Sequence, residues 1–152
     1  MRAWSGARCS ERRRALISVL SPTGRLKGAR GEGGVRSELI VESGGRGLYD
    51  ITTQLRQLVR ASGLKRGVAI LYSEDPLCRL VTLEYDADLV EDLMSLISNL
   101  NAKNPYVIAS IFQPSMVIPF EEGLLLGSFQ QICLVDLNES GGARKVVVEV
   151  IG

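Results

Sequence analysis

From Ser37 onward, short apolar runs follow one another so closely that only two stretches leave room for a helix. One begins after Asp50, a good N-cap, and its apolar residues recur three and four positions apart until Gly63. The other covers residues 86–100 with the same spacing. Two helices are too few to connect the strands of a doubly wound parallel sheet. The sequence therefore predicts an α+β fold with mainly antiparallel sheets and two helices.

The remaining apolar runs are rich in β-branched residues and are bounded by turn-forming residues, which favours strands. The longest run, 123–136, is predicted to be one strand bent at Gly127, and residues 138–142 a hairpin turn before the last strand. The buried stripe of the second helix is expected to consist of Leu89, Leu93, Leu96, Ile97 and Leu100. The strands are expected at 37–42, 67–72, 79–85, 106–112, 115–119, 123–136 and 144–150.

Residues 1–35 are predicted to be a basic extension of a single domain that covers residues 36–152. Residues 1–34 carry eight basic and two acidic residues, whereas the rest of the chain carries 10 basic and 15 acidic residues. Three interpretations remain open: nucleic-acid contact through Arg12-Arg13-Arg14, a transit peptide, or an extension outside the fold, with the native start near Val35. The third is favoured and nucleic-acid binding is not expected, because the segment is poor in aromatic residues that stack on bases.

The chain contains no histidine, which removes most of the catalysis that operates near neutral pH. Ser-His-Asp and Cys-His catalytic sites and histidine-based zinc sites are excluded. Cys9, Cys78 and Cys133 are far apart and form no CxxC pair, so neither a zinc ribbon nor a disulfide framework is expected. No apolar run approaches the ~20 residues of a membrane span. We therefore expect a cytoplasmic protein with no membrane partner.

Glu84 and Asp86 are the carboxylates best placed for chemistry, because they lie between a predicted strand and the helix that follows it. Together with Asp92 they could bind Mg²⁺ through oxygen ligands. The alternative is that Asp86 caps the helix and Asp92 is solvated. Arg144 and Lys145 follow a Gly-Gly turn and could clamp a phosphate. They could equally be the cations that protect an edge strand from aggregation.

The block from Ile118 to Gly152 resembles the end of the YjbQ family, which is also called UPF0047. That family carries Ile-Pro, a Gly and then Leu-Gly-Thr-Trp-Gln, and here Gly127-Ser128-Phe129-Gln130 stands at Gly-Thr-Trp-Gln. Gly47 to Thr52 is similar to the family's Asp-Ile-Thr signature. Further short matches, all in the family's order over residues 36–152, are Ser62-Gly63, Asn101-Ala102, Ala109-Ser110 and Pro114-Ser115.

The resemblance implies an α+β domain that assembles as a homotrimer. Some relatives are associated with a secondary thiamine-phosphate synthase activity, which joins a hydroxymethylpyrimidine diphosphate to a thiazole phosphate. The family's site is built around metal-holding histidines, and here Asp75, Asn104 and Tyr106 occupy their positions. With Gln130, these three residues are implied to line the ligand site.

Side-chain oxygens do not reproduce a site of three imidazoles for zinc. No cofactor is therefore expected, and Mg²⁺ is expected only with a phosphorylated ligand that brings it. Glu84 and Asp86 match acids of the family. The resemblance thus implies that the acidic residues of the family's site are retained, whereas its histidines are replaced.

Two functions follow from these residues and this resemblance. The first is a non-catalytic, trimeric binding or structural module that has lost the family's histidines. The second is a thiamine-phosphate synthase-like transferase that uses Glu84, Asp86 and Arg144 on a phosphorylated small molecule. A nucleic-acid binder that uses the basic segment is a third and weaker possibility.

Overall fold

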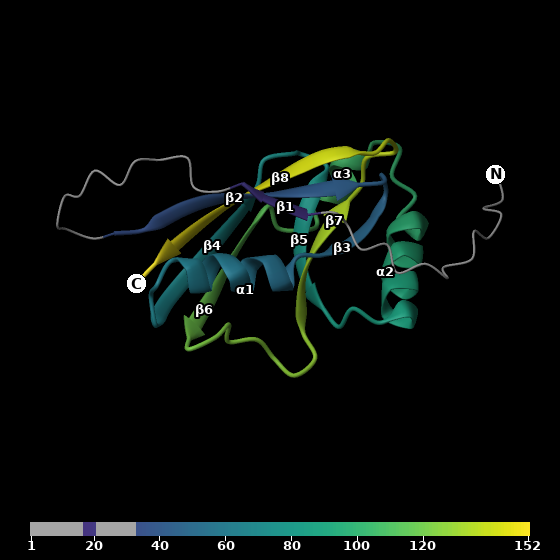
Figure 1. The fold of residues 1–152 in the computed structure, drawn as a ribbon. Helices are drawn as coiled ribbons and strands as arrows, with labels where there is room; N and C mark the ends of the chain where they lie inside the picture. Colours follow the sequence, from purple (N-terminus) through teal and green to yellow (C-terminus); the bar gives the residue numbers. More distant parts are fainter. Residues whose placement is uncertain (1–16, 21–32) are drawn as a thin grey trace.

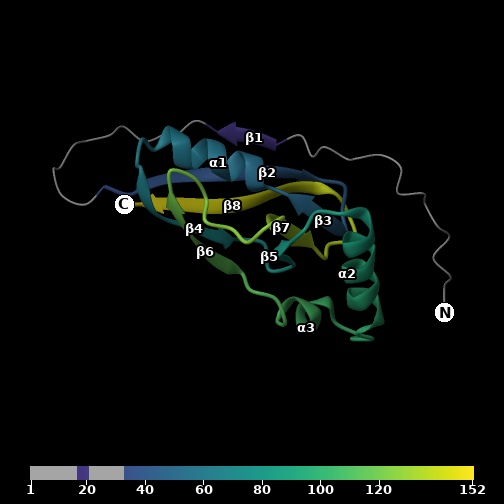
Figure 2. The same cartoon turned by 90° about the horizontal axis from the view of Figure 1, so that it is seen from below.

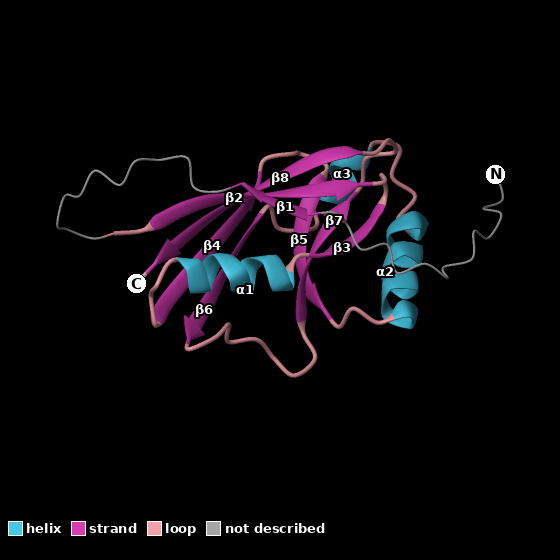
Figure 3. Ribbon diagram, viewed as in Figure 1, coloured by secondary structure: helices cyan, strands magenta, loops and turns pink. Residues whose placement is uncertain are grey.

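The computed structural model describes residues 17–20 and 33–152, which form two antiparallel sheets and three helices (Figures 1 and 3). The α+β class with antiparallel sheets is confirmed, and the third helix is a short addition to the two that were predicted. The strands are β1 (Ile17–Leu20), β2 (Val35–Ser43), β3 (Gly47–Asp50), β4 (Arg66–Ser73), β5 (Cys78–Leu83), β6 (Ser115–Glu121), β7 (Gln131–Asp136) and β8 (Gly142–Ile151). The helices are α1 (Thr52–Ala61), α2 (Ala87–Asn99) and α3 (Pro105–Ala109).

The larger sheet has the strand order β1-β2-β8-β4-β6, and every neighbouring pair is antiparallel. Alternate residues of its strands are buried, as in β8, where Val146, Val148 and Val150 point to one side. Helix α1 covers that side with Leu55, Leu58 and Val59. The sheet therefore has one face on the core and one face open, which is typical of antiparallel sheets.

The smaller sheet has the order β3-β7-β5, so β7 is its central strand. The side chains of β7 are buried on both faces of this sheet. Ile132 and Leu134 join the core under α1, whereas Cys133 and Val135 join a second core with α2 and α3. Figure 2 shows α1 and α3 on opposite sides of β5 and β7. A strand enclosed in this way must be almost wholly apolar, which accounts for the sequence Ile132 to Val135.

Two chain connections pack against each other where the sheets meet. An ideal Cβ added to Gly45, between β2 and β3, would lie 2.7 Å from the carbonyl oxygen of Glu139, between β7 and β8. A Cβ on Gly141 would lie 2.6 Å from the carbonyl oxygen of Ser43. Gly45 also has a φ of +101°, which side chains disfavour. These glycines let the two backbones approach closely, and they bring the end of β2 to the end of β7.

Two strand predictions and one hairpin prediction differ from the structure. Residues 106–112 include helix α3, because Asn104 and Pro105 supply an N-cap and a first-turn proline. Residues 123–130 form a loop rather than the first part of β7. Residues 138–142 do not close a hairpin, because β7 belongs to the smaller sheet and β8 to the larger. β8 is also an interior strand, so Arg144 and Lys145 do not protect an edge.

The helix boundaries were predicted well, but two details differ. The buried side of α2 is formed by Val90, Leu93, Met94 and Ile97, whereas Leu89, Leu96 and Leu100 are exposed. This side of α2 faces the second core, which it shares with the smaller sheet and with Ile108 and Ala109 of α3. The N-cap of α1 is Ile51, one residue after Asp50, although Asp50 still accepts a hydrogen bond from the Thr52 amide.

Apart from β1 and residues 33–35, the predicted basic extension lies outside the described residues. This includes the run Arg12-Arg13-Arg14, so its role stays a prediction. β1 pairs with β2 in antiparallel register, with Ile17 opposite Val41. Among the described helices, none combines the length and the apolar character that a membrane span requires.

Replacing Gly45 by Ala should destabilise the fold, because the new Cβ would meet the Glu139 carbonyl and force a disfavoured φ. We expect a loss of about 2–4 kcal/mol in the free energy of unfolding, measured with urea. Gly123→Ala is the control, since a Cβ there has no atom within 4 Å. Equal stability of the two variants would contradict this packing.

Candidate functional site

Polar side chains gather at the two ends of β7. The pairing of β5 with β7 places Cys78 opposite Asp136 and Leu83 opposite Gln131. Residues that precede β5 in sequence therefore lie at the Asp136 end, and residues that follow it lie at the Gln131 end. We call the group at the first end the Asp136 cluster; it consists of Ser43, Asp75, Asp136, Asn138 and Arg144.

Asp136 is completely buried, and its carboxylate is fully hydrogen-bonded. One oxygen, Oδ2, accepts the Ser43 hydroxyl at 2.5 Å and Nε of Arg144 at 2.8 Å. The other, Oδ1, accepts the Asn138 amide N–H at 2.9 Å and the Asn138 side-chain amide at 2.8 Å. A carboxylate offers about four lone-pair sites, so none remains for a ligand.

Arg144 is the cation of the cluster, and its side chain is 13% exposed. Besides Asp136, it binds the Ser140 carbonyl through Nη2 at 2.5 Å, and its Nη1 lies 3.9 Å from Oδ2 of Asp75. Asp75 accepts the Leu77 amide at 2.8 Å and the side-chain amide of Asn138 at 3.3 Å. The predicted residues Asp75 and Arg144 are thus brought together, with most of their polar atoms already engaged.

The pKa values in the cluster describe a permanent ion pair. Burial alone would raise the pKa of Asp136, but the hydrogen bonds from Ser43, Arg144 and Asn138 outweigh it and lower the pKa. Burial would likewise lower the pKa of Arg144, and its bond to Asp136 raises it. Burial, followed by the charges of Asp136 and Asp75, raises the pKa of the Cys78 thiol. None of these groups is suited to exchange protons near neutral pH.

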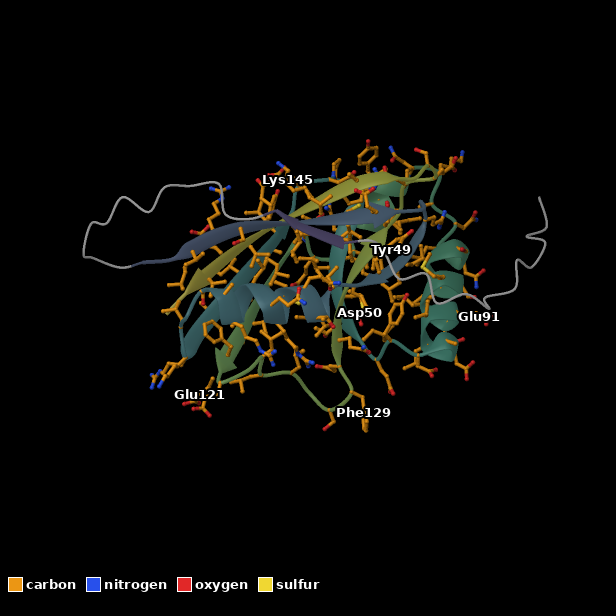
Figure 4. All side chains as sticks on the ribbon, viewed as in Figure 1. Tyr49, Asp50, Glu91, Glu121, Phe129 and Lys145 are labelled. Atoms are coloured by element: carbon orange, nitrogen blue, oxygen red, sulfur yellow. The ribbon has the colours of Figure 1, made fainter. Side chains whose placement is uncertain are left out.

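The Gln131 cluster, at the other end of β7, consists of Asp50, Thr52, Tyr85 and Gln131. Asp50 accepts the Thr52 hydroxyl at 2.6 Å through one oxygen and the side-chain amide of Gln131 at 2.9 Å through the other. Gln131 in turn accepts the Tyr85 amide at 2.7 Å, and the Tyr85 hydroxyl donates to the Leu48 carbonyl. Asp50 is half-buried, and Figure 4 labels it beside the start of α1. This network joins α1 to the connection between β5 and α2.

Glu84 and Asp86 lie beside the Gln131 cluster and are exposed. Asp86 is the N-cap of α2 and accepts the Asp88 amide at 3.0 Å. The Glu84 carbonyl accepts the Asp86 amide. Arg144 belongs to the opposite end of β7, so the structure does not gather the three residues predicted to be catalytic.

The remaining predicted ligand residues lie on exposed segments. Asn104 is the N-cap of α3 and accepts the Tyr106 amide at 3.0 Å. The side chain of Gln130 accepts the Gly127 amide at 3.3 Å, within the loop before β7. Figure 4 shows the neighbouring Phe129 projecting outward from that loop. Within the described residues, no hydrogen bond or ion pair joins Asn104 or Tyr106 to Asp75.

The metal site implied by the resemblance does not fit these residues. Asp75 and Asn104 already use a side-chain oxygen on a backbone amide, and no three His, Cys, Asp or Glu side chains of the described residues are grouped to hold a metal ion. Oxygen donors in such positions are also poor substitutes for imidazole at a zinc centre.

Sequence reasoning missed Asp136, Asn138 and Ser43. One signal was available for Asp136: it is a single charge that follows the apolar run Ile132 to Val135. A buried charge in such a strand requires a partner, and Arg144 is the first cation that follows it. No comparable signal identifies Ser43, which is brought in by the contact at Gly45.

Comparison with protein families matches residues 37–152 to the model described as UPF0047 protein YjbQ-like. No curated protein matches the sequence. The match covers the region predicted to be the domain.

Solved structures show the same fold. A YbjQ-like protein of unknown function from Sulfolobus solfataricus P2 is 26% identical, with a TM-score of 0.73 over 80% of this chain and 99% of that chain. A hypothetical protein from Aeropyrum pernix K1 is 21% identical, with a TM-score of 0.72 over 77% and 98%. A conserved protein of the YjbQ/UPF0047 family from Clostridium acetobutylicum is 23% identical, with a TM-score of 0.69 over 75% and 98%.

Asp136→Asn should destabilise the protein by about 3–5 kcal/mol at pH 7, because Arg144 would lose its buried counter-charge. Glu139→Gln, an exposed acid nearby, is the control and should change stability little. Urea unfolding at one protein concentration measures both.

The lowered pKa of Asp136 fixes the direction in which the stability of the protein changes with pH. Because folding lowers the pKa of Asp136, its stabilisation is complete above the ordinary value of about 3.9 and is lost as the pH falls through the lower, folded-state pKa. Stability of the native protein should therefore fall more steeply in acid than that of Asp136→Asn. Parallel acid profiles would argue against the lowered pKa.

Proposed function

Because the chain belongs to the YjbQ-like UPF0047 family over residues 37–152, we propose that it is a non-catalytic member of that family. It acts as a binding or structural module and assembles as a homotrimer. The fold of the family is retained. At two of the positions where the resemblance places histidines, the side chains of Asp75 and Asn104 accept hydrogen bonds from backbone amides instead.

The observation that carries this proposal is how three polar side chains of the predicted site are used: Asp75 and Asn104, which stand at these positions, and Asp86, which was predicted to be catalytic. Asp75, Asp86 and Asn104 each accept a hydrogen bond from the backbone amide two residues later. This is the local contact that shapes turns and helix starts. Side chains held in this way stabilise backbone and have less freedom to bind a reacting group.

The transferase alternative receives less support from the geometry. Its three residues are divided between the ends of β7, and Arg144 is bound to Asp136. A phosphate would have to displace that carboxylate, and doing so would leave a completely buried charge unpaired. Such a cost opposes the use of Arg144 as a phosphate clamp.

Two separate apolar surfaces support assembly into a ring. On the open face of the larger sheet, Ile70 is opposite Val117 and Tyr72 is opposite Val147 in neighbouring strands. The second surface is formed by α2, α3 and the residues that directly follow each helix, and its exposed residues are Leu96, Leu100, Val107 and Ile111. A subunit with two different exposed apolar surfaces can form a closed ring by head-to-tail contacts, in which one surface binds the other surface of the next subunit. That the ring has three subunits is what the resemblance to the family implies.

A cytosolic location is part of the same proposal. Cys78 and Cys133 are free and buried, and burial followed by the charge of Asp50 raises the pKa of Cys133 to about 12. Thiols in this state are inert and are common in reducing compartments.

The experiment is an assay of the purified full chain with hydroxymethylpyrimidine diphosphate, thiazole phosphate and Mg²⁺. We expect thiamine phosphate to form no faster than without protein, and sedimentation to give about three times the 16.5 kDa mass of the chain. Catalysed product formation that is lost in Glu84→Gln would establish the transferase instead. A monomer at micromolar concentration would remove the trimer from the proposal.

A further inference from the structure

A cleft of about 560 Å³ opens between the end of α1 and the turn that follows β6. Its apolar lining includes Val59 and Phe120 of the main core, together with Leu64 and Leu124, which pack against that core. Figures 1 and 4 show this corner, where β6 ends near Glu121 and α1 ends above it. The volume lies within the range of ordinary small-molecule sites, which is about 300–1,000 Å³.

The rim of the cleft is mainly positive. Arg56 and Arg60 are four residues apart and share one side of α1, and Lys65 follows the helix. Glu122 is the one acidic residue in the lining. The ion pairs found among the described residues involve Arg144 and Lys145, and none includes these three cations.

An ordinary structural role accounts for only one of these cations. A basic residue in the last turn of a helix is favoured by the helix dipole, and Arg60 holds that position. Arg56 lies one turn earlier, and Lys65 lies beyond the helix end. Three neighbouring cations around a cleft repel one another and raise the local concentration of anions.

The two walls of the cleft are fixed by backbone contacts. The Glu122 amide donates to the Lys65 carbonyl at 2.8 Å, and the Glu121 amide donates to the Gly123 carbonyl at 2.9 Å. Phe120 and Leu124 are joined by an isolated β-bridge. The cleft is therefore formed before any ligand arrives, which lowers the entropic cost of binding.

We propose that this cleft binds a small organic anion. A carboxylate, sulfate or phosphate group lies between the guanidinium groups of Arg56 and Arg60, which offer paired donors to such oxygens. The apolar part of the ligand covers Phe120 and Leu124. The site goes beyond the proposed function, because its lining shares no residue with either polar cluster of β7.

The test is titration of the full chain with phenyl phosphate, followed by calorimetry and by amide chemical shifts. Inorganic phosphate supplies the anion alone, and benzyl alcohol supplies the ring alone. We expect phenyl phosphate to saturate the protein and to shift the amides of Lys65 and Glu122, with each partial probe at least about tenfold weaker.

The matched variants are R56Q/R60Q and R36Q/R46Q, which remove the same charge from exposed arginines inside and outside the cleft. We expect R56Q/R60Q to weaken phenyl phosphate at least about tenfold and R36Q/R46Q to change it less than about twofold. Circular dichroism and melting identify any variant that fails to fold, and Lys65→Gln then serves as a second cleft variant.

Three results would overturn the site: no saturation by phenyl phosphate, equal binding of inorganic phosphate, or equal loss in R56Q/R60Q and R36Q/R46Q. Each would leave the thiamine-phosphate assay and the sedimentation result unaffected, so failure of this site is distinguishable from failure of the proposed function.

Discussion

Asp136 carries a negative charge at the end of a strand that is buried on both faces, and it is stable there only because the chain returns to it from three directions. Ser43 arrives from the end of β2, Asn138 from the following connection and Arg144 from the start of β8. β7 belongs to the smaller sheet, whereas β2 and β8 belong to the larger. The carboxylate therefore links the two sheets at the place where the chain crosses between them. Gly45 and Gly141 allow the backbones to approach closely enough for these bonds.

This interaction also decides what the site can do. A carboxylate with four donors and a lowered pKa is a poor base, and an arginine bound to it is a poor phosphate clamp. At the other end of β7, Asp50 and Gln131 are engaged in a similar way with Thr52 and Tyr85. The cations around the cleft beside α1 are different, because no described carboxylate is paired with them. Binding capacity in this protein is therefore expected at the cleft rather than at the ends of β7.

Local sequence patterns predicted where the helices and strands lie better than they predicted which of them pack against each other. The apolar spacing located α1 and α2 to within a few residues, because it reports burial along a single element. It could not show which side of α2 faces the smaller sheet and α3, and the predicted stripe was rotated for that reason. Arg144 was singled out from its position after a turn, whereas its pairing with Asp136 depends on how the two sheets meet. No strand was predicted at Gly47–Asp50, yet these residues pair with Cys133 to Asp136 of β7 as strand β3.

The coupling between Asp136 and Arg144 is measured most directly by a double-mutant cycle on the free energy of unfolding. The three variants are Asp136→Asn, Arg144→Gln and the double variant, compared at one protein concentration and pH 7. If the pair links the sheets, the double variant should be more stable than the sum of the single losses implies, by about 2 kcal/mol or more. Losses that add to within about 0.5 kcal/mol would show that the two charges act independently, and would contradict the role given to Asp136.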